Sequence, residues 1–317
     1  MKKTVILIAK LTITLGLLYF AFSHANLGLL AERAQRLNVV WLLAAVIVLG
    51  VQTFVTALRW RSIVAECGAT ISVTEAARYT FISLFFSQML PSTIGGDAAR
   101  VWLSARDGIG WSTAIYSVII DRVAGVLVLA LFVVVCIPAS FAVIHDPLAR
   151  AALLIVGVSS VLAPALFIAI GARQWTALQR FSATRHINAA AHAGHRIFTS
   201  PRAATWILGL SFFTQILTIT VAWLAAKSIV APFDFIDVVL LVPPVLLIAT
   251  IPISIAGWGL REGAMVLAFA YSGLPQADGL LVSALFGITI LVVAALGGIL
   301  WLTGARRAIE PSANRLA

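Results

Sequence analysis

Residues 113–137 read TAIYSVIIDRVAGVLVLALFVVVCI, and the fold class follows from apolar segments of this kind. Apart from Asp121 and Arg122, most of its side chains are apolar. As a helix it is long enough to cross a hydrocarbon layer about 30 Å thick. A peptide group inside a bilayer finds no water to bond, so a spanning segment must satisfy its backbone internally. We therefore predict a transmembrane helix over residues 113–137.

Apolar segments of similar length recur along the whole chain. Of its 317 residues, 61% are hydrophobic and 11% are charged, and the mean hydropathy is +1.04. A soluble domain has about 45–50% apolar and about 25% charged residues, so its core could not absorb this much apolar surface. We predict a single all-α polytopic membrane domain over residues 1–317. It should have about six full spans, at residues 4–22, 39–58, 113–137, 149–170, 203–226 and 280–302.

Positive charges at the ends of the spans predict how the chain threads the membrane. Residues 171–202 carry no acidic residue and five arginines, which are Arg173, Arg180, Arg185, Arg196 and Arg202. Because loops rich in Lys and Arg stay in the cytoplasm, this segment should lie there, either as a basic helix on the anionic leaflet or as a plain connecting loop. Basic residues near both chain ends and after residues 39–58 mark the same side. We therefore expect both termini on the cytoplasmic side of a bacterial-type plasma (inner) membrane.

Two further apolar regions, residues 75–108 and 236–272, are interrupted near the middle by Pro, Gly and charge. The first break reads LPSTIGGD at residues 90–97, and the second reads IPISIAGWG at residues 251–259. With six full spans and both termini on one side, each region must leave the membrane where it enters. We therefore predict two opposed re-entrant helical hairpins, the first entered from the cytoplasm and the second from the other face.

The two breaks align without a gap. PSTIGGDAAR at residues 91–100 and PISIAGWGLR at residues 252–261 agree at Pro, Ile, Gly and Arg, and the spans around them run in opposite senses. This pattern is typical of an inverted-topology repeat, in which broken helices place a binding site near the midplane. The chain would divide into halves of about residues 1–145 and 203–317, joined by the basic segment. A chance match between two kinks rich in Gly and Pro is the alternative.

Besides Lys10, six ionisable residues fall inside the membrane segments. Each costs about 2.5–3.5 kcal/mol at a helix centre on insertion scales. Three acids against three arginines make the set neutral, which predicts mutual pairing. Two interpretations stay open: an ion-pair network that holds the hairpins together, or arginines that bind a lipid phosphate while the acids hold them in place. The six residues are Asp97, Arg100, Asp121, Arg122, Arg261 and Glu262.

Each break should end in a helix start near the midplane. Free backbone N–H groups and the positive end of the helix dipole would point at an anion there, and the arginine fork matches phosphate oxygens. Trp258, at depth between two glycines, is expected to stack on the substrate or gate its path. The predicted phosphate-binding residues are Arg100, Arg261, Gly95, Gly96, Gly257 and Gly259, and the supporting charge network is Asp97, Asp121, Arg122 and Glu262.

The remaining composition excludes several classes of function. A net charge of +10 would suggest nucleic acid for a soluble protein, but in a membrane protein such charge sits in loops that meet anionic headgroups. Neither Cys67 nor Cys136 predicts a disulfide or a metal site, and the histidines from His186 to His195 have no Cys or carboxylate beside them. We expect no metal, no cofactor and no catalytic residue, and membrane lipids with anionic headgroups as partners.

Three motifs follow one another along the chain: LPSTIGGDAAR at residues 90–100, DRVAG at residues 121–125 and GWGLREG at residues 257–263. They resemble the hallmark segments of the lysylphosphatidylglycerol synthase transmembrane-region family, also called flippase-like domain proteins, and the resemblance covers nearly the whole chain. In the best-known members this region moves aminoacylated phosphatidylglycerol between leaflets, and a soluble C-terminal domain charges the lipid with lysine. The chain stops at Ala317, soon after its last span. The resemblance therefore implies a stand-alone member without the synthase domain, which does not make lysylphosphatidylglycerol.

The first functional hypothesis is a flippase-like protein that translocates an anionic or aminoacylated phospholipid, or a related polar lipid, between leaflets. The alternative is an integral membrane enzyme in phospholipid, polyprenyl-lipid or glycolipid metabolism, with Asp97 or Glu262 as acid or base, or the partner of a separately encoded lipid-modifying enzyme. A third hypothesis is a secondary transporter of a small solute that uses the acids as proton sites. The missing lysyltransferase domain favours transport over catalysis.

Overall fold

The computed structural model describes residues 2–90, 94–173, 182–231 and 234–313, and all regular structure within these ranges is helical. Up to six of its helices or helix pairs are candidate membrane spans. One is α1 (Lys2–Ser23), counted together with α2 (Leu27–Gln35) across a bend of 86°. The five that qualify alone are α3 (Val39–Glu66), α6 (Trp111–Val143), α7 (Pro147–Ile170), α9 (Pro201–Ser228) and α12 (Gln276–Ala313). The prediction of an all-α membrane protein is confirmed. Five of the predicted spans correspond to helices that qualify alone, and a count of six is reached only if α1 and α2 together form one span.

Side-chain caps explain where several of these helices begin. Asn38 accepts a hydrogen bond from the Val40 N–H at 3.0 Å, and α3 starts at the next residue. Asp146 accepts from the Ala149 N–H at 2.8 Å at the start of α7. Such caps satisfy backbone donors that have no partner inside the helix. The end of α3 is different from the prediction, because the helix continues to Glu66 and thus carries Arg59 well inside it.

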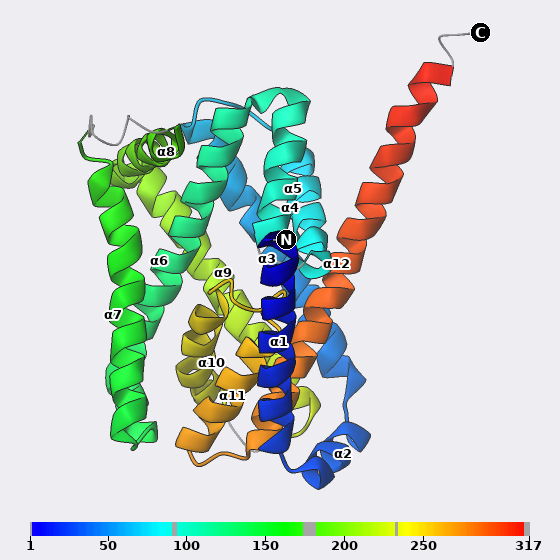
Figure 1. Ribbon diagram of the computed structural model, residues 1–317, viewed down its shortest axis with the longest axis vertical. Helices are drawn as coiled ribbons and strands as arrows, with labels where there is room; N and C mark the ends of the chain where they lie inside the picture. The colour runs from blue at the N-terminus through cyan, green and yellow to red at the C-terminus, as the bar shows by residue number, and fades with distance from the viewer. Residues whose placement is uncertain (1, 91–93, 174–181, 232–233, 314–317) are drawn as a thin grey trace.

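Two pairs of shorter helices flank the predicted breaks. The first pair is α4 (Val73–Met89) and α5 (Ile94–Ser104), and the second is α10 (Phe235–Ala249) and α11 (Leu260–Tyr271). The two members of each pair pack against each other. In Figure 1 the first pair occupies the end of the molecule that carries α8 (Ser182–Thr199), and the second pair occupies the end that carries α2. The pairs therefore approach the middle of the bundle from opposite ends. Residues 91–93 of the first break lie outside the described residues.

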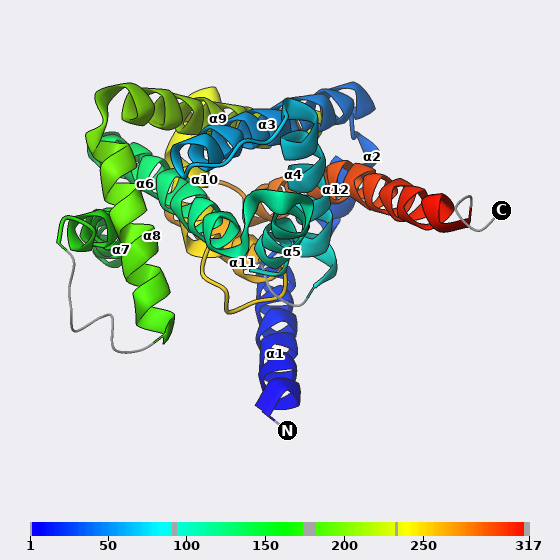
Figure 2. The same ribbon diagram turned by 90° about the horizontal axis from the view of Figure 1, so that it is seen from above.

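The bundle is held by long helix contacts around these pairs. Seen from above, α3 and α9 lie side by side, while α1 and α12 project from the bundle (Figure 2). Where α12 crosses α4, a Cβ on Gly297 would collide with the Phe81 carbonyl group. Small residues allow two helix backbones to approach closely inside a membrane, so Gly297 makes this crossing feasible.

Part of the basic segment predicted at residues 171–202 is helix α8. It lies across the ends of α6, α7 and α9 rather than along them (Figures 1 and 2). Ala190, Ala191 and Ile197 are buried, whereas Arg196 is exposed. The expectation of a plain connecting loop is therefore wrong for residues 182–199, while residues 174–181 lie outside the described residues. A short π-helix, η1 (Ala105–Ile109), joins α5 to α6 at the same end.

Candidate functional site

Five charged side chains from three helices form one continuous chain of ion pairs. Asp121 on α6 accepts from Arg59 Nε of α3 at 2.8 Å and from Arg100 Nη1 of α5 at 3.1 Å. Arg100 also donates through Nη2 to Asp97 at 3.3 Å. Arg122 completes the chain, since its Nε donates to the other Asp97 oxygen at 2.7 Å. We call these five residues the central cluster.

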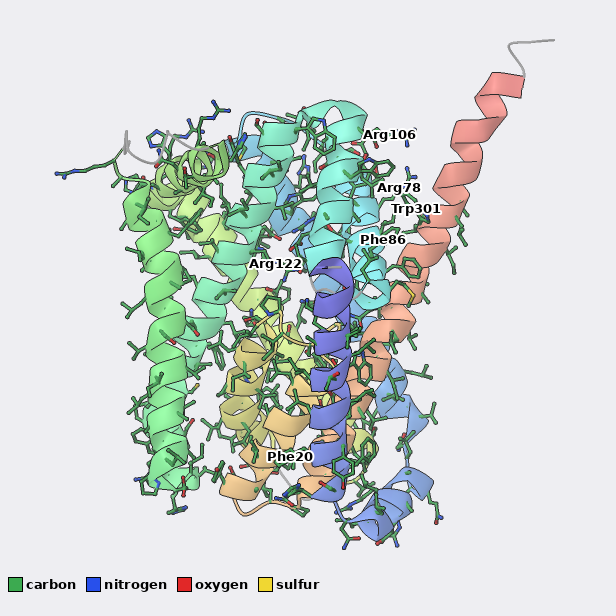
Figure 3. All side chains as sticks on the ribbon, viewed as in Figure 1. Phe20, Arg78, Phe86, Arg106, Arg122 and Trp301 are labelled. Atoms are coloured by element: carbon green, nitrogen blue, oxygen red, sulfur yellow. The ribbon has the colours of Figure 1, made fainter. Side chains whose placement is uncertain are left out.

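Local geometry explains how the short helix α5 contributes to the central cluster. It begins at Ile94 with Asp97 in its first turn, so the helix starts before Gly95 and Gly96 and not after them, as the sequence had suggested. Asp97 and Arg100 are three residues apart and therefore share a face, as the sequence predicted. Asp121 and Arg122 are consecutive, yet both belong to the cluster. The Asp121 side chain is 4% exposed, and the long Arg122 side chain is 53% exposed. Arg122 lies near the middle of the bundle in Figure 3.

The central cluster borders a cavity of about 310 Å³, here called the central cavity. Three arginines against two aspartates leave the cluster with one net positive charge. Arg100 is 3% exposed, and its Nε has no hydrogen-bond partner within the described residues. Uncharged polar side chains line much of the remaining wall, and they are Gln52, Thr53, Thr56, Thr80, Ser83, Ser87, Gln215 and Thr250.

Sequence reasoning missed Arg59, which it interpreted as a marker of the cytoplasmic end of a span. In the structure Arg59 is 6% exposed and also donates to Ser211 of α9 at 3.2 Å. The available signal was the apolar pattern beyond Arg59, because Trp60, Ile63 and Val64 continue the helix and are fully buried. An arginine followed by a buried turn of helix lies inside the protein and not at its boundary.

The glycines at the first break serve packing. A Cβ on Gly96 would collide with the Ser83 carbonyl and the Ser87 hydroxyl of α4, and one on Gly95 would lie 2.6 Å from Leu90 Cδ1. Neither glycine is among the residues that line the central cavity. In the structure these glycines thus allow α5 to fold back against α4. Their direct contact with a phosphate stays a prediction.

The second break forms a separate cluster around Arg261 and Glu262. Arg261 donates to Glu262 Oε1 at 2.6 Å through Nη2 and to Ser283 Oγ at 3.0 Å through Nε. Glu262 also accepts from the Gly259 N–H at 2.7 Å, so its carboxylate caps the start of α11. Trp258 lies against the Arg261 guanidinium, 5.1 Å from ring centroid to Cζ. The expected anion position at this helix start is therefore filled by the protein's own carboxylate.

The two predicted arginines thus belong to different environments. Arg100 borders the central cavity, whereas Arg261, Trp258 and Glu262 are not among the residues that line it. Gly257 and Gly259 have φ values of +81° and +83°, which favour glycine and shape the break. Within the described residues the two arginines therefore do not share one site. The neutral set of six separates into a neutral group of four, to which Arg59 adds one positive charge, and the neutral pair of Arg261 and Glu262.

Comparison with known proteins places the chain in a family. A sequence profile described as "Lysylphosphatidylglycerol synthase TM region" matches residues 7–298. A UPF0104 membrane protein of Pyrococcus horikoshii, PH1989, is 25% identical over 165 residues, which are 51% of this chain and 47% of that protein. The match thus spans about half the length of this curated relative. No solved structure matches significantly. Because the profile covers most of the chain, the protein belongs to the lysylphosphatidylglycerol synthase transmembrane-region family.

Proposed function

We propose that the protein is a flippase-like lipid transporter that moves an anionic phospholipid, or a related polar lipid, between leaflets through the central cavity. The main support for the proposal is the net positive charge of the central cluster, which lies at the edge of a polar cavity inside a membrane bundle. Burying an uncompensated arginine in the bilayer is costly. A phosphodiester brings one negative charge and would neutralise the net charge of +1.

The hydrogen-bonding capacity of the cavity supports the same ligand. Arg100 Nε is a buried donor without a partner in the described residues, and a phosphate oxygen would satisfy it. Arginine is also the side chain best suited to phosphate, because its fork of donors can bind two oxygens at once. The hydroxyl and amide side chains of the wall suit the ester and hydroxyl oxygens of a lipid headgroup. An aminoacylated headgroup adds positive charge, so we rank a plain phosphodiester above lysylphosphatidylglycerol as substrate.

The arrangement of the helix pairs suggests how a headgroup could cross. We propose that α4 with α5 and α10 with α11 are re-entrant hairpins of an inverted repeat, with the α8 end and both termini in the cytoplasm of a bacterial-type inner membrane. Small relative movements of the two pairs would open the central cavity to one leaflet and then to the other. The acyl chains would stay in the surrounding lipid throughout.

A liposome assay tests this proposal. Purified protein is reconstituted with fluorescent phosphatidylglycerol, and a membrane-impermeant reagent quenches the outer-leaflet probe; wild type should expose protected probe faster than empty liposomes do. Arg100→Gln should slow this exposure by at least about tenfold, equivalent to 1.4 kcal/mol. Arg106→Gln is the matched control, because Arg106 stacks on Trp102 of the same segment and does not line the central cavity.

Stability must be monitored, because removing a buried charge can unfold the bundle. Arg100→Lys therefore serves as a second variant that keeps the charge and loses the fork. Equal translocation by Arg100→Gln and wild type, at equal thermal stability, would contradict the proposed route. Failure of wild type with several anionic lipids would contradict transport itself.

The enzymatic alternative draws less support from the geometry. Glu262 accepts hydrogen bonds from the Arg261 guanidinium, the Ser283 hydroxyl and the Gly259 N–H. Asp97 is bridged by Arg100 and Arg122. Both carboxylates are thus already engaged by the protein's own hydrogen-bond donors. If the alternative holds, lipid mass spectrometry after incubation of phosphatidylglycerol with the purified protein would reveal a product. Adding a separately encoded lipid-modifying enzyme to the same assay would test a role as its partner.

A further inference from the structure

A second polar cavity lies at the α8 end of the molecule, between the end of α3 and the start of α9. Its volume is about 880 Å³. We call it the interface groove. It is lined by Arg61, Ser62, Ala65, Glu66, Thr70, Ile71, Ser200, Pro201, Arg202, Ala203, Thr205 and Trp206.

The groove combines positive charge with hydroxyl groups and one large aromatic side chain. Arg61 and Arg202 outnumber the single acid Glu66. Arg61 donates through Nε to the Ile71 carbonyl at 3.0 Å, and both residues line the groove. Trp206 is 59% exposed, and its Nε1 donates to Ser62 Oγ at 3.1 Å, so the indole is held at the rim. Tryptophan in such a position is typical of the level between headgroups and acyl chains.

The position of the groove along the bundle agrees with that level. Both lining helices have their ends here, since α3 finishes at Glu66 and α9 begins at Pro201. The Ser200 side chain makes no capping hydrogen bond at the start of α9, so the dipole of this helix adds to the positive potential. Arg196 of α8 donates to the Glu66 carbonyl at 3.2 Å and places a further cation beside the groove.

The interface groove is separate from the central cavity. Arg59 borders the central cavity and Arg61 lines the groove, although both belong to α3. Two positions along an α-helix correspond to a rotation of about 200°, so the two arginines leave α3 on opposite sides. A ligand in the groove would therefore contact none of the central cluster.

We propose that the interface groove binds the phosphate of an anionic membrane lipid that stays in the leaflet at the α8 end. Arg61 and Arg202 bind the phosphate oxygens, and the hydroxyls of Thr70, Ser200 and Thr205 bond the remaining headgroup oxygens. Trp206 packs against the glycerol and upper acyl region. Free inorganic phosphate shares the charge but not the apolar part, so the exposed indole favours the lipid. This site does not depend on translocation through the central cavity.

Lipid retention by the full-length protein tests the site. The protein is purified in nanodiscs of phosphatidylcholine with phosphatidylglycerol, released, and examined by native mass spectrometry for bound lipid. The double variant Arg61→Gln/Arg202→Gln should bind phosphatidylglycerol roughly 25-fold more weakly, because each arginine near an anionic headgroup contributes a factor of about five. Arg106→Gln removes the same charge at the same end (Figure 3) but outside the groove, and should retain the lipid like wild type.

The remaining arms distinguish the outcomes. Retention of phosphatidylglycerol by the double variant at the wild-type level would overturn the proposal. Displacement of the lipid by millimolar inorganic phosphate would overturn the lipid assignment in favour of a free anion. If the double variant is unstable, the single variant Arg202→Gln, which changes an exposed side chain, should still weaken retention about fivefold. Phosphatidylcholine retention should be the same in all variants.

Discussion

Asp121 is the residue whose replacement should damage the central cluster most. It is 3% exposed and accepts from two buried arginines, at 2.8 Å from Arg59 and at 3.1 Å from Arg100. Asp121→Asn keeps the shape but removes the charge. One of the two oxygens becomes an NH₂ group, which faces an arginine donor instead of accepting from it. The net charge of the cluster rises from +1 to +2.

The expected cost follows from the burial of all three groups. Removing one partner of a buried ion pair destabilises a protein by about 3–5 kcal/mol, because the other charge is left without compensation. For a chain of more than 250 residues, one kcal/mol lowers the melting temperature by roughly 2 °C. We therefore expect Asp121→Asn to melt about 6–10 °C below wild type. The control is Glu32→Gln, since Glu32 pairs with Arg36 at 3.3 Å while its side chain is 55% exposed, and the shift there should stay below about 2 °C.

Thermal unfolding in detergent, followed by size-exclusion chromatography, measures both variants. A second arm adds phosphatidylglycerol, which should raise the melting temperature of Asp121→Asn more than that of wild type. The physical reason is that an anion bound by the folded state stabilises it in proportion to its affinity, and the variant cluster carries more positive charge. If Asp121→Asn melts within about 2 °C of wild type, the buried arginines do not depend on Asp121 and the reasoning fails.

Three other predictions concern the packing of α5 against α4, the ion pair between Arg33 and Asp278, and the reactivity of the Cys67 thiol. Gly96→Ala forces a Cβ into α4 and should cost about 1–3 kcal/mol, whereas Gly209→Ala, which meets nothing within 4 Å, should gain up to about 1 kcal/mol; equal melting temperatures would contradict this. Arg33→Ala leaves the buried Asp278 side chain, 0% exposed, without its ion-pair partner at 3.2 Å. The expected loss of stability in thermal unfolding is about 3 kcal/mol, with partial recovery in Arg33→Lys. An Arg33→Ala variant as stable as wild type would show that this ion pair does not stabilise the fold. Burial raises the pKa of the Cys67 thiol to about 11, which depresses the reactive thiolate at neutral pH. Maleimide labelling should therefore accelerate about tenfold per pH unit between pH 7 and 10, and a plateau below pH 9 would refute the shift.

Much of the fold could be predicted because hydropathy and helix breaks are local properties of a sequence. The long apolar segments had to be helices wherever they lie in the bundle, since the bilayer leaves backbone groups no other partner. The break between α10 and α11 contains Gly257 and Gly259, whose positive φ values do not fit a helix. The end of α3 could not be predicted in this way. Arg59 resembled a boundary charge, but Asp121, 62 positions further along the chain, and Ser211 of α9 supply the partners that make its burial tolerable.

The candidate site was predictable where partners are close in sequence. Asp97 and Arg100 share a helix face, and Arg261 and Glu262 are neighbours. Their assembly was not predictable, because both expected arginines looked equivalent at the level of the two aligned breaks. In the structure Arg100 borders the central cavity, whereas Arg261 is paired with Glu262, the carboxylate that caps the start of α11.

Hydropathy and charge pattern are sufficient to establish that this protein lies in a membrane, that its spans are helical, and that its few buried charges must be compensated. The reason is that the cost of placing an apolar segment in water, or a charge in lipid, depends on the residue and its solvent. Which charges compensate one another follows from the three-dimensional arrangement of the helices. That choice depends on which helices pack together, and it leaves one excess arginine charge beside the central cavity and none in the Arg261–Glu262 pair.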